Sequence, residues 1–279
     1  VWDDALTRDE FDSFMDLLYD NNNGEPGIYS RDAARYMMPD RRKKEINGVP
    51  IKFGLNPCGE INLRPMQFCN LSSVIAREDD TLEDLKRKVR IATMIGTIQS
   101  MATDFPGLRP EWKKNSEEER LLGVDINGQM DCKLLIHDYD GKTRLQLQRA
   151  AVLMNIHYSV LLDIEQSASV TCVKPNGNSS VFVGCSPGMN LRFARYYLRN
   201  VQISPDSPVY KVLEESGVPL REVAGITLAS FKEKAPDSGL VKGDLTPIEM
   251  LEYWKRNKLY WTEHNPSVSI YYDEKDKEP

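Results

Sequence analysis

The sequence predicts an α/β fold in which helices alternate with short strands over 279 residues. Several stretches repeat apolar residues at the spacing of amphipathic helices, and short apolar runs with strand-like composition lie between them. This alternation is typical of layered α/β and barrel architectures. Neither an internal repeat nor a glycine- and serine-rich linker divides the chain, so residues 1–279 are expected to form a single region.

Capping and stop signals predict the helices in chain order. Thr7 and Glu10 form a capping box before a helix that ends at the run 21–24, Asn-Asn-Asn-Gly. Thr81 opens the longest helix, which is expected to end near Phe105, before Pro-Gly. Further helices are predicted at 28–38 and 143–166, and another is expected to end at Gly217. The segment 108–120 is predicted as a charged, solvated helix or loop. The last helix is predicted to start at Pro247, where Thr246 and Glu249 form another capping box.

Strands are predicted within 121–131, at 168–174 and at 261–274. The last of these contains Tyr271 and Tyr272, β-favouring aromatic residues. Arg192, Arg195 and Arg199 recur at three- and four-residue spacing, which predicts a helix. The segment Gly24-Glu25-Pro26-Gly27 predicts a tight turn, whereas residues 218–242 show no clear pattern.

Composition and charge exclude two classes of protein. The net charge of −6 argues against a surface that binds nucleic acid, although a local basic pocket for a nucleotide is compatible with it. No run of eighteen apolar residues exists, so no membrane span is expected. The opening residues VWDDALTRDEF contain neither a signal peptide nor an initiating methionine, and they suggest the middle of a longer protein.

The five cysteines form no disulfide framework or zinc motif. Their number is odd and no CxxC occurs, which favours a reducing cytoplasm. The three histidines are scattered and show no metal-ligand spacing. Cys172 and Cys185 are interpreted as packed structural thiols. The cysteines are Cys58, Cys69, Cys132, Cys172 and Cys185, and the histidines are His137, His157 and His264.

The stretch GLNPCGEINLRPMQFCN, residues 54–70, contains the first group of candidate catalytic residues. If residues 56–60 are extended, Asn56, Cys58 and Glu60 share one face, roughly 6–7 Å apart along the strand, a spacing that suits a sugar ring. The intervening proline and glycine favour a loop inserted into a crowded interior. Cys69 follows Cys58 by eleven residues.

A second candidate site follows the strand predicted at 168–174. Pro175 to Ser180, PNGNSS, forms a small polar turn before a helix, where free backbone N–H groups favour an anion such as phosphate. The residues expected to hold phosphate are Asn176, Gly177, Asn178, Ser179 and Ser180.

Taken together, these strings resemble the catalytic chain of ribonucleotide reductases. The NPCGE form with its eleven-residue step to the FCNLSS cysteine is most similar to the adenosylcobalamin-dependent class II enzymes, of the monomeric ribonucleoside-triphosphate type. Further segments resemble the same family: GEPGI, RPEWKKNSEEERLLGV, VKPNGNSSVFVGCSPGMNLRFARYY and WTEHNPSVSIYYDE. Asn176 and Asn178 stand where the family prefers serine and threonine.

The resemblance implies a fold and a chemistry. The chain would be the later part of a ten-stranded α/β barrel with a central cysteine-bearing finger loop. Cys58 would carry a thiyl radical that removes the ribose 3′ hydrogen, with Glu60 as general base and Asn56 holding a ribose hydroxyl. Cys69 would be one of two thiols that supply electrons by forming a disulfide.

The resemblance also implies that adenosylcobalamin is the cofactor. The substrate would be a ribonucleotide, with the triphosphate favoured, and the reductant would be thioredoxin or a similar dithiol. The second thiol of the pair, the regulatory nucleotide site and the C-terminal cysteine pair would lie in regions that this chain lacks. The 279-residue chain is therefore expected to be catalytically incomplete by itself, in a cytoplasmic enzyme.

Two other interpretations remain open at this point. A class I catalytic subunit would receive its radical from a partner subunit through tyrosines such as Tyr271 and Tyr272. A non-catalytic nucleotide-binding fragment would retain only the turn at 175–180. Class III is less favoured, because no glycyl-radical segment is seen.

Overall fold

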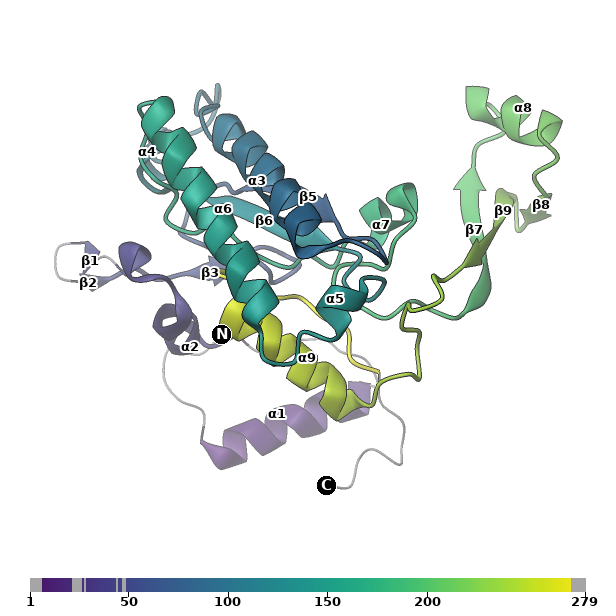
Figure 1. Ribbon diagram of the computed structural model, residues 1–279, viewed down its shortest axis with the longest axis horizontal. Coiled ribbons are helices and arrows are strands. Elements are labelled where there is room, and N and C mark those ends of the chain that lie inside the picture. Colours follow the sequence, from purple (N-terminus) through teal and green to yellow (C-terminus); the bar gives the residue numbers. More distant parts are fainter. Residues whose placement is uncertain (1–6, 22–26, 28, 44, 47–48, 272–279) are drawn as a thin grey trace.

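The computed structural model describes residues 7–21, 27, 29–43, 45–46 and 49–271. Figure 1 shows a central α/β body, the first helix below it, and an arm that projects to the right. The α/β class predicted from the sequence is confirmed by the alternation of helices and strands in the body.

Local signals placed most of the helices correctly. Thr81 and Asp84 form a reciprocal capping box at the start of α3, and Thr246 and Glu249 form another at the start of α9. The described helices are α1 (Arg8–Asn21), α2 (Arg31–Met37), α3 (Leu82–Gln99), α4 (Pro110–Glu119), α5 (Lys133–Ile136), α6 (Lys142–Leu161), α7 (Gly177–Val183), α8 (Pro208–Glu215) and α9 (Pro247–Tyr260), with a 3-10 helix η1 at Asp40–Arg42.

Helix α3 ends at Gln99 rather than near Phe105 as predicted. Arg120 donates a 2.7 Å hydrogen bond to the carbonyl oxygen of Ser100, which follows the helix, and so satisfies an acceptor at its end. Arg120 lies at the end of α4, so the residues near the end of α3 could not predict this contact.

The strands form one parallel pair, two short hairpins and an antiparallel sheet of three strands. In the body, β5 lies parallel to β6, with Ser73 opposite Asp125. The described strands are β1 (Glu45–Ile46), β2 (Val49–Pro50), β3 (Gly54–Leu55), β4 (Asn62–Leu63), β5 (Asn70–Ile75), β6 (Leu122–Asn127), β7 (Tyr196–Ile203), β8 (Leu220–Val223) and β9 (Ile226–Lys234).

Two extended segments continue the parallel order beyond β6. Thr171 forms a parallel bridge with Val124 of β6, and Val173 forms another with Pro266. The strands predicted at 168–174 and 261–274 are therefore extended segments joined by single bridges, and no regular strand is present between 261 and 271. Tyr272 and most of the segment 24–28 lie outside the described residues.

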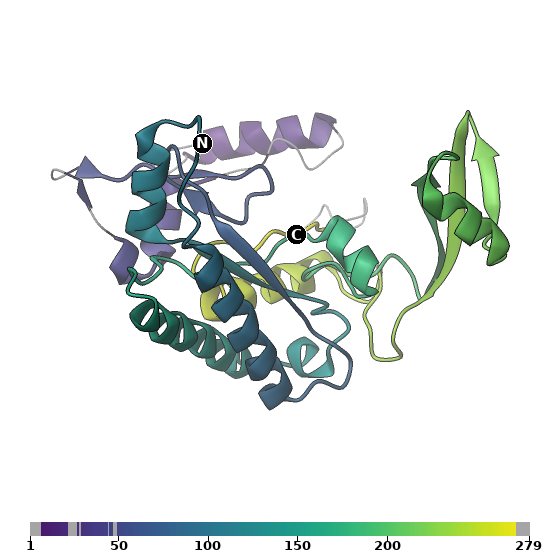
Figure 2. The same cartoon turned by 90° about the horizontal axis from the view of Figure 1, so that it is seen from above.

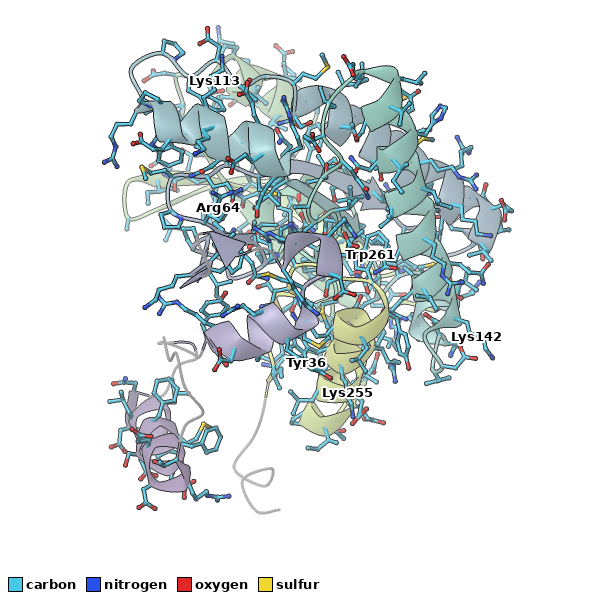
Figure 3. The ribbon with its side chains drawn as sticks, turned by 90° about the vertical axis from the view of Figure 1, so that its left-hand side faces the viewer. Tyr36, Arg64, Lys113, Lys142, Lys255 and Trp261 are labelled. Atoms are coloured by element: carbon cyan, nitrogen blue, oxygen red, sulfur yellow. The ribbon has the colours of Figure 1, made fainter. Side chains whose placement is uncertain are left out.

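The two faces of the parallel layer differ in character. Helices α3 and α6 pack together, and α3 covers β5 and β6 (Figure 1). Alternate strand residues point toward these helices, whereas their neighbours point to the opposite face. Among the latter, Ser73 lies opposite Asp125, and Gly123 lies on the same face of β6, opposite Leu71. The core contains Val74, Leu85, Val89, Leu122, Val124, Ile126, Leu147, Val170, Val173 and Trp261; Trp261 is labelled in Figure 3, which also shows α1 apart from the body.

The projecting arm corrects the prediction of a helix that contains the three arginines, and it places β8 and β9 in the segment 218–242, which shows no clear sequence pattern. Strand β9 pairs with both β7 and β8, and α8 accompanies this sheet (Figure 2). Arg199 lies within β7, and Arg192 and Arg195 precede it, so the predicted arginine helix is wrong. Eight residue pairs between β7 and β9 supply the long-range hydrogen bonding that overrides the helical spacing.

None of the helices in the described ranges has both the length and the apolar character required to cross a lipid bilayer.

Candidate active site

Residues 56–61 form the tip of the β3–β4 hairpin. The backbone N–H of Asn56 donates to the carbonyl oxygen of Ile61 at 3.2 Å, and that of Gly59 donates to the oxygen of Asn56 at 2.9 Å. Gly59 has a φ of +76°, a conformation that side chains disfavour. The prediction of an extended segment at 56–60 is therefore wrong, because the positive φ reverses the chain.

The hairpin nevertheless brings two of the predicted residues into direct contact. Asn56 Nδ2 donates a 2.7 Å hydrogen bond to Glu60 Oε2, and Asn56 Oδ1 accepts one of 2.9 Å from the N–H of Ile61. Glu60 is buried, with 2% of its surface exposed. Asn56 therefore both closes the loop and holds the carboxylate.

Cys58 lies at the exposed tip of this hairpin. The expectation that the cysteine loop runs through a crowded interior does not hold within the described residues. The tip turns outward between Asn56 and Glu60, so the thiol is accessible while the carboxylate beside it is buried.

Asn265 connects the hairpin to the segment that leads to the turn at 175–180. Its backbone N–H donates to the carbonyl oxygen of Glu60 at 3.0 Å, and its side-chain amide donates to that of Gly59 at 3.0 Å. Its own carbonyl oxygen accepts from the N–H of Val173 at 3.3 Å. Only Lys174 separates Val173 from Pro175, so the two candidate groups are joined through one residue.

Arg42 fixes the other strand of the hairpin. It is 1% exposed and donates to the carbonyl oxygen of Asn62 at 2.8 Å and to Glu119 Oε2 at 3.0 Å. Its Nη1 lies 3.4 Å from His264 Nδ1, and its guanidinium lies over the ring of Phe53. Glu119 is buried too, so α4 is not the wholly solvated segment that its charges predicted.

Two further thiols lie behind the hairpin, within the electrostatic influence of Glu60. Burial raises the pKa of Cys69, and the carboxylate of Glu60 adds to that increase. Burial likewise raises the pKa of Cys172, with contributions from Asp125, Cys69 and Glu60. Cys172 is fully buried, which agrees with a packed thiol. Cys185 is buried as well, and desolvation raises its pKa to about 12.

The turn predicted to bind phosphate does precede a helix. Asn176 caps α7 in the left-handed region, with a φ of +54°, and its carbonyl oxygen accepts the N–H of Ser180. Gly177, Asn178 and Ser179 are exposed, whereas Ser180 is buried. The first backbone N–H groups of a helix have no intrahelical acceptor, so the exposed start of α7 presents donors to solvent.

Asp125 is a buried acid that the sequence reasoning missed. It lies on the polar face of β6 and accepts hydrogen bonds from the N–H of Lys174, from Ser73 Oγ and from Asn176 Nδ2. Desolvation raises its pKa to about 6, although these three donors oppose the increase. The sequence signal that could have indicated this residue is that Asp125 is the single charged residue in the strand LGVDIN.

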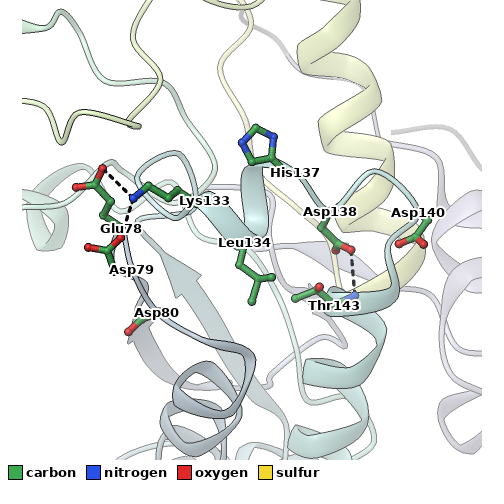
Figure 4. A pocket seen from close by; sticks show the side chains of 9 residues that line it. All are labelled: Glu78, Asp79, Asp80, Lys133, Leu134, His137, Asp138, Asp140 and Thr143. Atoms are coloured by element: carbon green, nitrogen blue, oxygen red, sulfur yellow. Dashed lines mark hydrogen bonds and ion pairs between the residues drawn. The ribbon is translucent and has the colours of Figure 1, made fainter.

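Several hollows lie outside the hairpin in the described part of the chain, and two of them differ sharply in charge. One, of about 180 Å³, adjoins α7 and is lined by Gly177 and Ser180, by the aromatic residues Phe193, Tyr197 and Tyr271, and by Arg192, Arg199 and Lys242. The other, of about 550 Å³, is an acidic hollow around α5 whose lining is drawn in Figure 4. Lys133 pairs there with Asp79 at 2.7 Å, and none of the predicted site residues contributes to it.

Two solved structures share the fold of this chain. The crystal structure of a B-12 dependent (class II) ribonucleotide reductase superposes with a TM-score of 0.68 at 21% identity, covering 79% of this chain and 35% of the other. The class Id ribonucleotide reductase alpha subunit of Actinobacillus ureae gives 0.58 at 15% identity, covering 92% and 54%. The fold is that of ribonucleotide reductase catalytic chains.

Relatives found by sequence similarity indicate which class of ribonucleotide reductase the chain resembles. The adenosylcobalamin-dependent ribonucleoside-triphosphate reductase of Euglena gracilis is 27% identical over 270 residues, covering 90% of this chain and 35% of the relative. That of Levilactobacillus brevis is 28% identical over 227 residues, covering 70% and 29%. No family model matches the chain. The chain is a homologue of adenosylcobalamin-dependent ribonucleoside-triphosphate reductases and spans about a third of their length.

Proposed function

We propose that this protein reduces ribonucleotides, as triphosphates, to 2′-deoxyribonucleotides. One observation carries the proposal: an exposed cysteine thiol lies beside the buried carboxylate of Glu60, which Asn56 holds by a hydrogen bond, and Asn265 joins that hairpin to the segment leading into the turn at 175–180. A reactive sulfur, a base and a site for phosphate are thereby provided by one connected unit. Homology to ribonucleoside-triphosphate reductases supports the choice of reaction.

In this proposal each residue of the hairpin has a distinct role. Cys58, as a thiyl radical, takes the hydrogen from C3′ of the ribose. Glu60 accepts the proton of the 3′-hydroxyl, and Asn56 holds a ribose hydroxyl while orienting Glu60 through its 2.7 Å hydrogen bond. Loss of water from C2′ then requires two electrons, which two thiols supply when they close to a disulfide.

Cys69 is proposed as one of those two thiols. It is partly exposed behind the hairpin, and its pKa is raised, so it is held as a thiol that carries a proton as well as an electron. Its partner cysteine is proposed to lie in the remainder of the enzyme. A dithiol protein such as thioredoxin would reduce the disulfide back to two thiols, in a cytoplasm whose reducing environment keeps thiols reduced.

Adenosylcobalamin is the proposed cofactor. When bound, it supplies the radical by homolysis of its cobalt–carbon bond. The described residues fit such a cofactor because the thiol of Cys58 is exposed at the hairpin tip, where a bulky group has access to it. The remaining strands of a ten-stranded barrel, with this hairpin as its finger loop, would enclose the site in the complete enzyme.

The phosphates are proposed to bind at Asn176, Gly177, Asn178, Ser179 and Ser180. The exposed start of α7 supplies backbone donors there. The hollow beside it adds the cation of Lys242, which favours a polyanion, whereas Arg199 lies 3.9 Å from the carboxylate of Glu233. Arg192 contributes little charge, since it forms a two-contact ion pair with Asp131 at 2.7 and 2.9 Å.

The test is reduction by the protein expressed from its complete gene. With a dithiol and adenosylcobalamin, we expect a ribonucleoside triphosphate to give the 2′-deoxy product, detected by chromatography. Activity that requires a metal-bearing second subunit and ignores the cobalamin would select class I chemistry. Nucleotide binding without turnover under either condition would indicate a non-catalytic nucleotide-binding protein.

Replacing Glu60 with glutamine is expected to lower kcat by about 10²–10⁴-fold while changing KM little, because the amide keeps the shape but cannot accept the proton. Steady-state kinetics of the complete enzyme would measure this. Glu118→Gln is a suitable control, since that carboxylate is exposed on α4 and pairs with Arg64. Turnover equal to the wild type in Glu60→Gln would remove the base from the mechanism.

A further inference from the structure

A continuous hydrogen-bond chain connects β5, β6 and the start of α7. Ser73 Oγ donates to Asp125 Oδ2 at 2.7 Å, and Asn176 Nδ2 donates to the same oxygen at 2.5 Å. Asn176 Oδ1 in turn accepts from Ser179 Oγ at 2.8 Å. Asp125 Oδ1 accepts the backbone N–H of Lys174 at 2.8 Å, so both carboxylate oxygens are engaged.

This chain of hydrogen bonds uses both the amide nitrogen and the amide oxygen of the Asn176 side chain. Asn176 is 6% exposed and adopts a left-handed backbone conformation that non-glycine residues rarely occupy. A residue in this region is retained only where its surroundings determine it, and here the determining group is Asp125. The side chain of Asn176 is therefore turned inward, while the exposed backbone at Gly177 and Asn178 faces solvent.

We infer that Asp125 is a positioning residue that shapes the phosphate turn through Asn176. This inference rests on the proposed function and goes beyond it, because it assigns the Asn176 side chain to holding the turn rather than to contacting phosphate. Asp125 fixes Lys174 and Asn176 on either side of Pro175, and thereby sets the direction of the first N–H groups of α7.

The same contacts make the turn sensitive to pH. All three neighbours of the carboxylate are donors, so the ionised form is the one that the site matches. Protonation below about pH 6 removes an acceptor site from this arrangement and loosens the turn. Among the described residues, the titratable groups that interact with Asp125 include Lys174, whose charge lowers the pKa of that carboxyl, and the thiols of Cys172 and Cys185.

The test is nucleotide affinity, measured by isothermal titration of a ribonucleoside triphosphate into the protein expressed from its complete gene. Asp125→Asn and Asn176→Ala are each expected to weaken binding about tenfold. Because both act through one contact, the double variant should be no weaker than about the worse single variant. As pH drops through about 6, the wild-type affinity should fall more steeply than that of Asp125→Asn, because protonation of the nucleotide phosphates weakens binding in both proteins. Asp206→Asn, an exposed carboxylate on the arm, serves as matched control.

The inference would be overturned if the double variant lost as much affinity as the two single variants combined. It would also be overturned if Asp125→Asn bound the nucleotide with the affinity and pH profile of the wild type. If Asp125→Asn does not fold, Ser73→Ala removes one contact to the carboxylate and should shift the pH profile of binding; an unchanged profile would count against it. A wild-type protein that binds no nucleotide at all would overturn the proposed function as well, so the two failures are distinguishable.

Discussion

Replacing Cys58 with serine is expected to lower nucleotide reduction by at least about 10³-fold, because a hydroxyl cannot take over the radical chemistry of a thiol. Nucleotide affinity should stay near the wild-type value, since the thiol is exposed at the hairpin tip and the proposed phosphate site lies at 176–180. Turnover assays and titration of the same preparation of complete enzyme would separate the two effects.

Cys132→Ala is the matched control for this substitution. Cys132 is buried in the core beside α5, away from the hairpin, so any general effect of losing a thiol appears there without loss of chemistry. Thermal unfolding of both variants would exclude misfolding as the cause. Unchanged turnover in Cys58→Ser would refute the assigned role of this residue.

Replacing Arg42 with methionine is expected to reduce the free energy of unfolding by about 3–5 kcal/mol, because it leaves the buried carboxylate of Glu119 without its charged partner. Gln67 Nε2 still donates to that carboxylate at 2.7 Å, but it carries no charge. The carbonyl oxygen of Asn62 loses a donor too, so the Cys58 hairpin should loosen. Urea-induced unfolding at equilibrium would measure the change.

Two further variants test the cause of this destabilisation. Arg8→Met removes an exposed ion pair with Asp12 and should leave the urea midpoint of unfolding close to that of the wild type, because solvent screens such a pair. The double variant Arg42→Met with Glu119→Met removes both buried charges and should recover much of the loss. A change below about 1 kcal/mol in Arg42→Met alone would show that this buried pair contributes little to stability.

Much of this molecule could be predicted from contiguous residues. The caps at Thr81 and Thr246 fix helix starts because the side chains that satisfy the first N–H groups lie within three positions. The turn at 175–180 preceded a helix as expected. The local spacing predicted Asn56 and Glu60 near Cys58 on one face of an extended segment, whereas a reversed chain brings Asn56 and Glu60 into direct contact.

Contacts between distant residues were decided only by the tertiary structure. The guanidinium of Arg42 lies beside Glu119 and His264, which are 77 and 222 residues away along the chain. Asp125 reaches Asn176 because β6 and the segment 169–173 lie side by side, and the arginines near 195 lie on and before a strand because β9 pairs with β7. A side chain's partners across such separations depend on how whole elements pack. The amino-acid sequence alone thus singled out the candidate site residues and the turn, and packing determined which groups hold them in place.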